Sequence, residues 1–134
     1  MTNHIFVYGT LMGMTNLGSN SFVNRLSNIS RTVEYVGKDT VKGILLNLGS
    51  FPGLIDLDNT ESIVKGEVYQ ILNLKILGYF DRYEGYTGDP ETSLYTRETT
   101  LTGLGVEVYV YQYRITHSPT RGVIESGDWN DYRK

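Results

Sequence analysis

The stretch that decides the fold is Ile63-Val64-Lys65-Gly66-Glu67-Val68-Tyr69-Gln70-Ile71-Leu72, followed directly by Asn73. Valine, isoleucine and tyrosine dominate this run, and apolar and polar residues largely alternate, which is typical of a β-strand. Gly66 inside the run indicates a bulge or a close approach of another backbone. Asn73 is a favoured N-cap residue, so the sequence predicts a helix from Asn73 to about Glu84.

Shorter apolar runs on both sides of this strand and helix indicate further strands. A turn cluster is expected at residues 49–53, and residues 21–26 are expected to form a short helix. Thr102-Gly103-Leu104-Gly105 is expected to join two strands as a hairpin. The strands are predicted at residues 4–8, 32–36, 41–48, 94–101 and 106–114, with a short extended run at 54–57. Many short strands and one strong helix predict an α+β fold on a curled or barrel-like sheet.

The composition limits the organisation and the partners. A chain of 134 residues is long enough for one domain with its own core, so we expect a single domain over residues 1–134. It has no cysteine, which excludes disulfides and thiolate chemistry. A net charge of −3 gives no reason to expect nucleic acid or an anionic membrane as partner. The first residues do not resemble a secretory signal, so we expect a cytoplasmic protein, and a monomer.

The familiar catalytic motifs are missing from the sequence. His4 and His117 do not have the spacing of a metal-binding pair, and no phosphate-binding glycine loop or Gly-x-Ser-x-Gly motif occurs. We therefore expect no metal and no cofactor. If the protein is an enzyme, carboxylates and backbone N–H groups are the groups that remain for the chemistry.

The predicted helix carries one glutamate in an unusual position. An apolar stripe with helical spacing, expected to face the core, is formed by Ile76, Leu77, Phe80 and Tyr83. Glu84 falls on the same stripe, where burial, the negative end of the helix dipole and nearby Asp81 would each raise its pKa. A carboxyl with a raised pKa can act as both base and acid. The alternative is that Glu84 simply ends the helix in solvent. Asp81 and Arg82 are expected to lie on a solvated face of the helix.

A second candidate stretch follows the first predicted strand, as Tyr8-Gly9-Thr10-Leu11. Glycine lets a backbone approach a ligand closely, and the N–H groups of Thr10 and Leu11 can then bind an anion. The alternative is an ordinary turn in which Thr10 is a cap. Pro52 and Gly53 leave the same two interpretations open, a turn or a second side of a pocket.

Together these segments resemble the γ-glutamylcyclotransferase-like superfamily, which includes the γ-glutamylamine cyclotransferases and the plant AIG2-like proteins. Thr10 and the closing Gly-Asp-Trp place the chain nearer the γ-glutamylamine branch. The resemblance extends over nearly the whole chain and is carried, in order, by FVYGTLM, FPGLI, VKGEVYQI, LGYFDRYEGY, LYTRE, VYVY and SGDW.

The resemblance implies a small mixed β-barrel with flanking short helices and a pocket at one end of the barrel. It implies a cofactor-independent reaction in which a γ-glutamyl amine or γ-glutamyl amino acid cyclises to 5-oxoproline and releases the free amine. Glu84 is then the catalytic acid and base. Tyr8, Gly9, Thr10 and Leu11 line the substrate site; Tyr8 and Tyr95 add hydroxyls to the pocket, or else belong to the core.

Several points stay open from the sequence. A non-catalytic module of the same fold that binds a small ligand or a partner protein is the alternative to an enzyme. The leaving amine is not identified, although the acidic segment Asp89-Pro90-Glu91 favours a cationic one. For Arg97 we favour a structural role, bracing the region of Glu84 by pairing with an acidic residue, over a role in the pocket.

Overall fold

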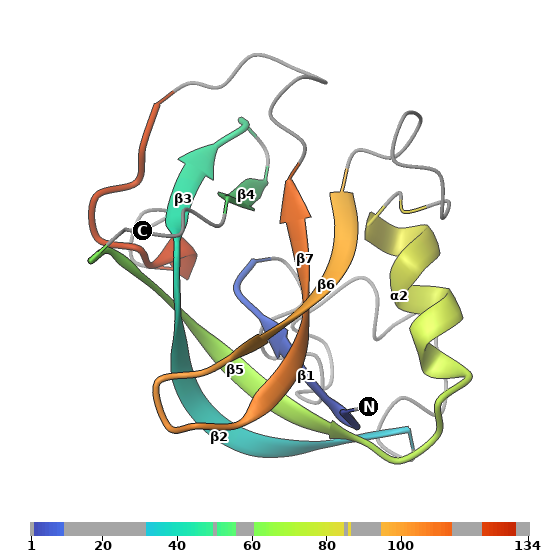
Figure 1. The fold of residues 1–134 in the computed structure, drawn as a ribbon. Helices are drawn as coiled ribbons and strands as arrows, with labels where there is room; N and C mark the ends of the chain where they lie inside the picture. Colours follow the sequence, from blue (N-terminus) through green and yellow to red (C-terminus); the bar gives the residue numbers. More distant parts are fainter. Residues whose placement is uncertain are drawn as a thin grey trace.

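The structure is a computed structural model, and it describes residues 2–9, 32–49, 51–55, 61–84, 86, 95–113 and 122–130, without the side chain of Tyr83. Three predictions lie outside the described residues: the helix at 21–26, the substrate-binding role of Thr10 and Leu11, and the acidic segment at 89–91. In the described part of the chain, seven strands form one mixed sheet beside one α-helix (Figure 1). This arrangement confirms the predicted α+β, barrel-like fold class.

The sheet has the strand order β2-β5-β1-β7-β4-β3, and β6 pairs with β7 as the second arm of a hairpin. β5 runs antiparallel to β1 and β2, whereas β1 and β4 each run parallel to β7. The elements are β1 (His4–Val7), β2 (Val33–Lys42), β3 (Ile44–Asn47), β4 (Pro52–Ile55), β5 (Ile63–Ile71), α2 (Ile76–Glu84), β6 (Tyr95–Leu101) and β7 (Glu107–Tyr113).

β5 is the strand predicted from the opening stretch, and it lies between β1 and β2. Gly66 marks a close approach of two backbones, as predicted: a Cβ atom there would lie 2.3 Å from the Val7 carbonyl oxygen. The bulge of this region is on β2 instead, where the register shifts between Tyr35 and Gly37. The missing side chain at Gly66 thus allows β1 and β5 to pack closely as the sheet curls.

The tip of the β6–β7 hairpin brings the two margins of the sheet together. Gly103 at the tip donates a hydrogen bond from its amide to the Thr40 carbonyl of β2, at 2.8 Å. Figure 1 shows the hairpin crossing over β5 and β2, while α2 stands to the side of it. The curled sheet is therefore closed at this end by the hairpin turn.

Alternation along the strands divides the core into two clusters. Ile5 and Val7 belong to the cluster that also contains the apolar face of α2, whereas Phe6 and Tyr8 belong to the other. Because successive side chains of a strand point to opposite faces, each face of β1 serves one cluster. The second cluster includes Trp129, which is 2% exposed.

α2 begins and packs largely as its sequence predicts. The Asn73 side-chain oxygen accepts a hydrogen bond from the Lys75 amide at 3.0 Å, so Asn73 caps the helix. Ile76, Leu77 and Phe80 are buried in the first cluster. Among the described helices, none is long and apolar enough to cross a membrane.

Candidate active site

Glu84 is the last residue of α2, and several strands end or begin near it. Tyr8 directly follows β1, Pro52 opens β4, and Tyr95 opens β6. The Glu84 side chain is partly buried, and this burial raises the pKa of its carboxyl from 4.5 to about 7. Near neutral pH both the carboxylate and the carboxylic acid are therefore populated.

The charge of Glu84 contributes to the raised pKa values of three tyrosines. Burial raises the pKa of the Tyr8 hydroxyl well above its usual value, and the charges of Tyr95 and Glu84 raise it further. For Tyr95, burial is again the main cause of the raised pKa and Glu84 comes second. Burial and a hydrogen bond to Asp81 raise the pKa of Tyr111, with a smaller contribution from Glu84. The Glu84 carboxyl thus lies among hydroxyls that stay protonated.

The hydroxyls of Tyr8 and Tyr95 are used within the fold. Tyr8 donates a hydrogen bond to the Tyr111 carbonyl at 2.5 Å and accepts one from the Leu54 amide at 3.1 Å. Tyr95 donates to the Pro52 carbonyl at 2.6 Å. These hydrogen bonds connect the start of β4 to β1, β6 and β7. Of the two alternatives for the hydroxyls, the structure gives direct support to the one in which they hold the core.

Gly9 also has a structural partner. A Cβ atom at Gly9 would lie 2.9 Å from Cγ of Pro52, so the absence of a side chain lets the two segments meet. A Cβ atom at Gly53 would likewise lie 2.7 Å from the Tyr113 Cβ. Tyr-Gly and Pro-Gly, which are far apart in the sequence, are thereby brought together at one end of the sheet.

The expectation that Asp81 lies on a solvated helix face is wrong. Nη1 of Arg97 donates to both carboxylate oxygens of Asp81, at 2.9 and 2.7 Å, and the Tyr111 hydroxyl donates to one of them at 2.6 Å. The Asp81 charge is therefore compensated, and burial is the cause of the raised Glu84 pKa. Arg82, by contrast, is exposed as predicted and lies over the Tyr79 ring.

The expected pairing of Arg97 with an acidic residue is confirmed, and Asp81 is that residue. Sequence reasoning missed Tyr111 as a third member of this contact. Its signal was available in the alternation of Val108-Tyr109-Val110-Tyr111, which places both tyrosines on the face of β7 opposite the valines. Within the described ranges, no group of three or more potential metal ligands occurs.

Comparison with known proteins adds an independent observation. The family model described as γ-glutamyl cyclotransferase, AIG2-like, matches residues 5–131. The chain belongs to this family. The match includes Glu84, the Tyr-Gly turn and the closing tryptophan, so it confirms the resemblance drawn from the sequence motifs.

Solved structures of AIG2-like and related proteins have the same fold. An AIG2-like protein from Mus musculus is 25% identical, with a TM-score of 0.64 over 87% of this chain and 80% of that chain. Protein ytfP from Escherichia coli is 27% identical, with a TM-score of 0.65 over 98% of this chain and 99% of that chain. An uncharacterized protein from Pyrococcus horikoshii, 21% identical, shares the fold with a TM-score of 0.64 over 98% and 93%. No curated protein matches the chain.

Proposed function

We propose that this protein is a γ-glutamyl cyclotransferase that uses Glu84 as general base and general acid. Its substrate is a γ-glutamyl amine or a γ-glutamyl amino acid, and its products are 5-oxoproline and the free amine. The observation that carries the proposal is the Glu84 carboxyl, which is partly buried among tyrosines and whose pKa is about 7. Membership of the AIG2-like γ-glutamyl cyclotransferase family supports the reaction class.

The reaction needs little more than positioning and proton transfer. The α-amino nitrogen of the γ-glutamyl group forms a bond to its own γ-carbonyl carbon, and the bond from that carbon to the leaving nitrogen breaks. Because nucleophile and electrophile belong to one molecule, holding them in an attacking conformation provides an effective molarity on the order of 10⁵ M or more. The chemistry therefore requires no cofactor and no covalent nucleophile on the protein.

Glu84 accounts for both proton transfers in this scheme. As a carboxylate it takes a proton from the substrate α-ammonium group, which then attacks as a free amine. As a carboxylic acid it returns that proton to the departing nitrogen. On ring closure the attacking nitrogen loses a second proton to become the lactam N–H, and this proton passes through the regenerated carboxylate to the released amine, which leaves as an ammonium group, so no proton is gained or lost overall. A pKa near the working pH makes one carboxyl effective in both directions, and such catalysis typically contributes about 10²- to 10⁴-fold.

Substrate binding is proposed at the same end of the sheet. The backbone N–H groups of the turn that begins at Gly9, namely those of Thr10 and Leu11, bind the substrate α-carboxylate. Tyr8 and Tyr95 line the site through their rings, because their hydroxyls already donate to backbone carbonyls.

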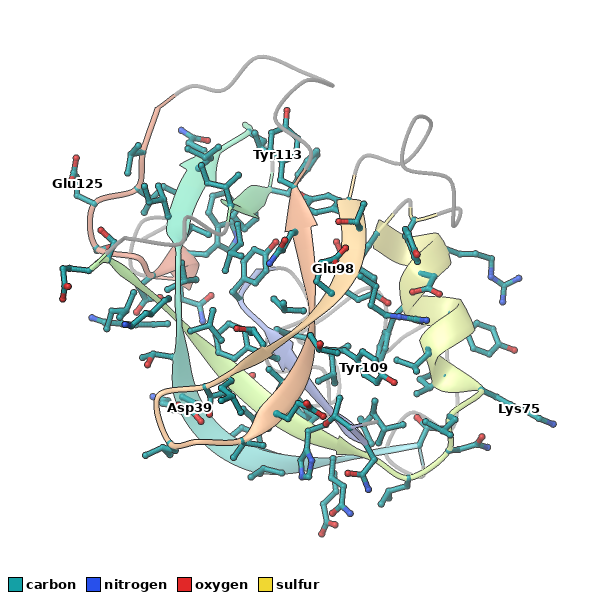
Figure 2. All side chains as sticks on the ribbon, in the orientation of Figure 1. Asp39, Lys75, Glu98, Tyr109, Tyr113 and Glu125 are labelled. Atoms are coloured by element: carbon teal, nitrogen blue, oxygen red, sulfur yellow. The ribbon has the colours of Figure 1, made fainter. Side chains whose placement is uncertain are left out.

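The test is a measurement of 5-oxoproline release from a panel of γ-glutamyl amino acids and γ-glutamyl amines. The wild type is compared with Glu84→Gln, which keeps the shape of the side chain and removes proton transfer. Glu125→Gln is the matched control, because Glu125 is exposed and lies far from α2 (Figure 2). We expect at least one substrate to react. Its kcat should be lower by a factor of about 10² or more in Glu84→Gln and unchanged in the control.

Two other outcomes contradict the proposal in different ways. Full activity of Glu84→Gln would leave the reaction correct and the role of Glu84 wrong. No turnover of any panel member, together with equal binding of one of them to wild type and Glu84→Gln, would favour the non-catalytic binding module.

A further inference from the structure

The last turn of α2 is attached to the sheet by one charged contact. Arg97 on β6 and Tyr111 on β7 both donate to the Asp81 carboxylate, at 2.6 to 2.9 Å. The side chains of the ion pair are 26% and 20% exposed, so the contact is partly shielded from water. A pair held in this way is screened less by salt than an exposed surface pair.

Aromatic rings hold the arginine in turn. The Arg97 guanidinium carbon lies 5.3 Å from the centre of the Tyr109 ring and 5.8 Å from that of Tyr86, both within the range of cation–π attraction. Figure 2 shows Tyr109 on the side of the hairpin that faces α2. Tyr86 also donates its amide to the Asp81 carbonyl at 2.7 Å. Asp81 is thus fixed through its side chain by the sheet and through its backbone by the segment that follows the helix.

This contact lies one helical turn before Glu84. Residues three apart on a helix are neighbours on its surface, so a contact that holds Asp81 also holds the turn of backbone that carries Glu84. Helix ends fray when nothing holds them, and the final residue of a helix is the most affected. Glu84 is that residue in α2.

We propose that Arg97 is a positioning residue for Glu84: by holding Asp81 against Tyr111, it fixes the last turn of α2 and with it the place of the Glu84 carboxyl. The contribution of Arg97 to turnover rests on the proposed function, whereas its effect on the helix end does not. Arg97 is not a catalytic residue in this proposal, since it acts only through Asp81.

The charges around Glu84 give the proposal a second consequence. Glu84 faces the hydroxyls of Tyr8, Tyr95 and Tyr111, from the segments at β1, β6 and β7. On its own helix, the acidic residue one turn before it is Asp81, whose charge is paired with Arg97 of β6. Removing the arginine would leave Asp81 as an uncompensated negative charge next to a second carboxyl. Such a like charge favours the protonated form of Glu84 and raises its pKa.

The experiment compares Arg97→Gln with the wild type by three measurements. Hydrogen exchange of the Tyr86 amide reports whether the helix end stays in place. A ¹³C NMR titration of the Glu84 side-chain carboxyl reports its pKa, and neither measurement requires activity. The third measurement is kcat and KM on the substrate found in the panel. Arg82→Gln is the matched control, because it removes the same charge from an exposed position two residues before Glu84.

In Arg97→Gln we expect Tyr86 amide exchange to be about 10-fold faster, with a Glu84 pKa about half a unit higher or more. We expect kcat to be at least about 10-fold lower and KM to change less than about 3-fold, because a misplaced group lowers the rate more than the binding. In the double variant that combines Arg97→Gln with Asp81→Asn, the pKa of Glu84 should return toward its wild-type value while kcat stays low. The control should change none of these.

Tyr111→Phe is the milder variant if Arg97→Gln does not fold, since it removes one hydrogen bond to Asp81 and keeps the ring and charge. It should accelerate Tyr86 exchange in the same direction. A lower melting temperature with unchanged Tyr86 exchange and unchanged Glu84 pKa, in either variant, would overturn the proposal. If the wild type converts no substrate, the proposed function fails, and the exchange and titration measurements still decide the role of Arg97.

Discussion

The guanidinium of Arg97 contacts both carboxylate oxygens of Asp81, three residues before Glu84 on the same helix. The acidic neighbour of Glu84 is thereby neutralised by a residue from the sheet. The raised pKa of Glu84 therefore follows from burial of its own carboxyl. A carboxyl governed by burial responds to changes in its surroundings more than to salt, because bulk ions do not screen a desolvation cost.

The activity should follow the ionisation of Glu84. The free enzyme must have Glu84 as carboxylate to accept the proton of the substrate ammonium group, so kcat/KM should rise with pH through an apparent pKa of about 7. The measurement is kcat/KM between pH 5.5 and 8.5 on the best substrate of the panel. Glu125→Gln should give the same curve. A kcat/KM that is constant across this range would show that Glu84 does not supply the base.

The stability of the protein should depend on pH in the opposite direction to kcat/KM. The folded pKa of Glu84 lies above its unfolded value of 4.5, so between about pH 4.5 and 7 the folded state holds more protons than the unfolded state. The free energy of unfolding therefore falls as pH rises through this window. Glu84→Gln lacks this loss, and we expect it to be more stable than the wild type by about 1–3 kcal/mol at pH 8.

Denaturation by urea at pH 4 and pH 8 checks this expectation. Near pH 4 the wild type and Glu84→Gln should differ little, because the wild-type carboxyl is then protonated in the folded state. Equal stability of the two proteins at pH 8 would show that the folded-state pKa of Glu84 is not raised.

The sequence predicted those strands and the helix whose residues show a clear local pattern of apolar spacing or alternation. The spacing of Leu77 and Phe80 fixes the inward face of α2, and the hairpin turn of 102–105 separates two alternating runs. The break expected between residues 36 and 41 is absent, because β2 continues from Val33 to Lys42. Gly37 to Thr40 have a turn-like composition, yet they pair with β5 through Lys65 to Val68. Pairing with β5 therefore outweighed the local preference of these residues for a turn.

The candidate site was predicted only in part for a related reason. Glu84 is conspicuous because a charged residue interrupts an apolar stripe of its own helix. The partners of Asp81 lie 16 and 30 residues farther along the chain, and no local pattern couples residues at such separations. Likewise, the contact of Gly9 with Pro52 depends on how the sheet curls. The binding of a carboxylate by Thr10 and Leu11 stays a prediction.

Gly66→Ala should test the close packing of β1 against β5. The new Cβ atom would lie 2.3 Å from the Val7 carbonyl oxygen and 2.6 Å from the Phe6 ring, so backbone must move to accommodate it. We expect a loss of about 3 kcal/mol in the free energy of unfolding, measured in urea. Gly78→Ala, in α2, is the control, because the Cβ atom that it adds would meet nothing within 4 Å. It should raise the free energy of unfolding by about 0.5–1 kcal/mol. Equal effects of the two substitutions would contradict the packing described for Gly66.

Tyr8→Phe should separate the structural use of the Tyr8 hydroxyl from a role in catalysis. The substitution removes the hydrogen bonds to the Tyr111 carbonyl and from the Leu54 amide, both in the buried core. Because buried polar backbone groups lose their partners, the free energy of unfolding should fall by about 2 kcal/mol. Tyr79→Phe, at an exposed position of α2, should change it by less than about 0.5 kcal/mol. With both hydrogen bonds committed to backbone, kcat measured well below the melting temperature should stay within about 3-fold of the wild type. A kcat lower by about 10²-fold in a folded Tyr8→Phe protein would instead place the hydroxyl among the reacting groups.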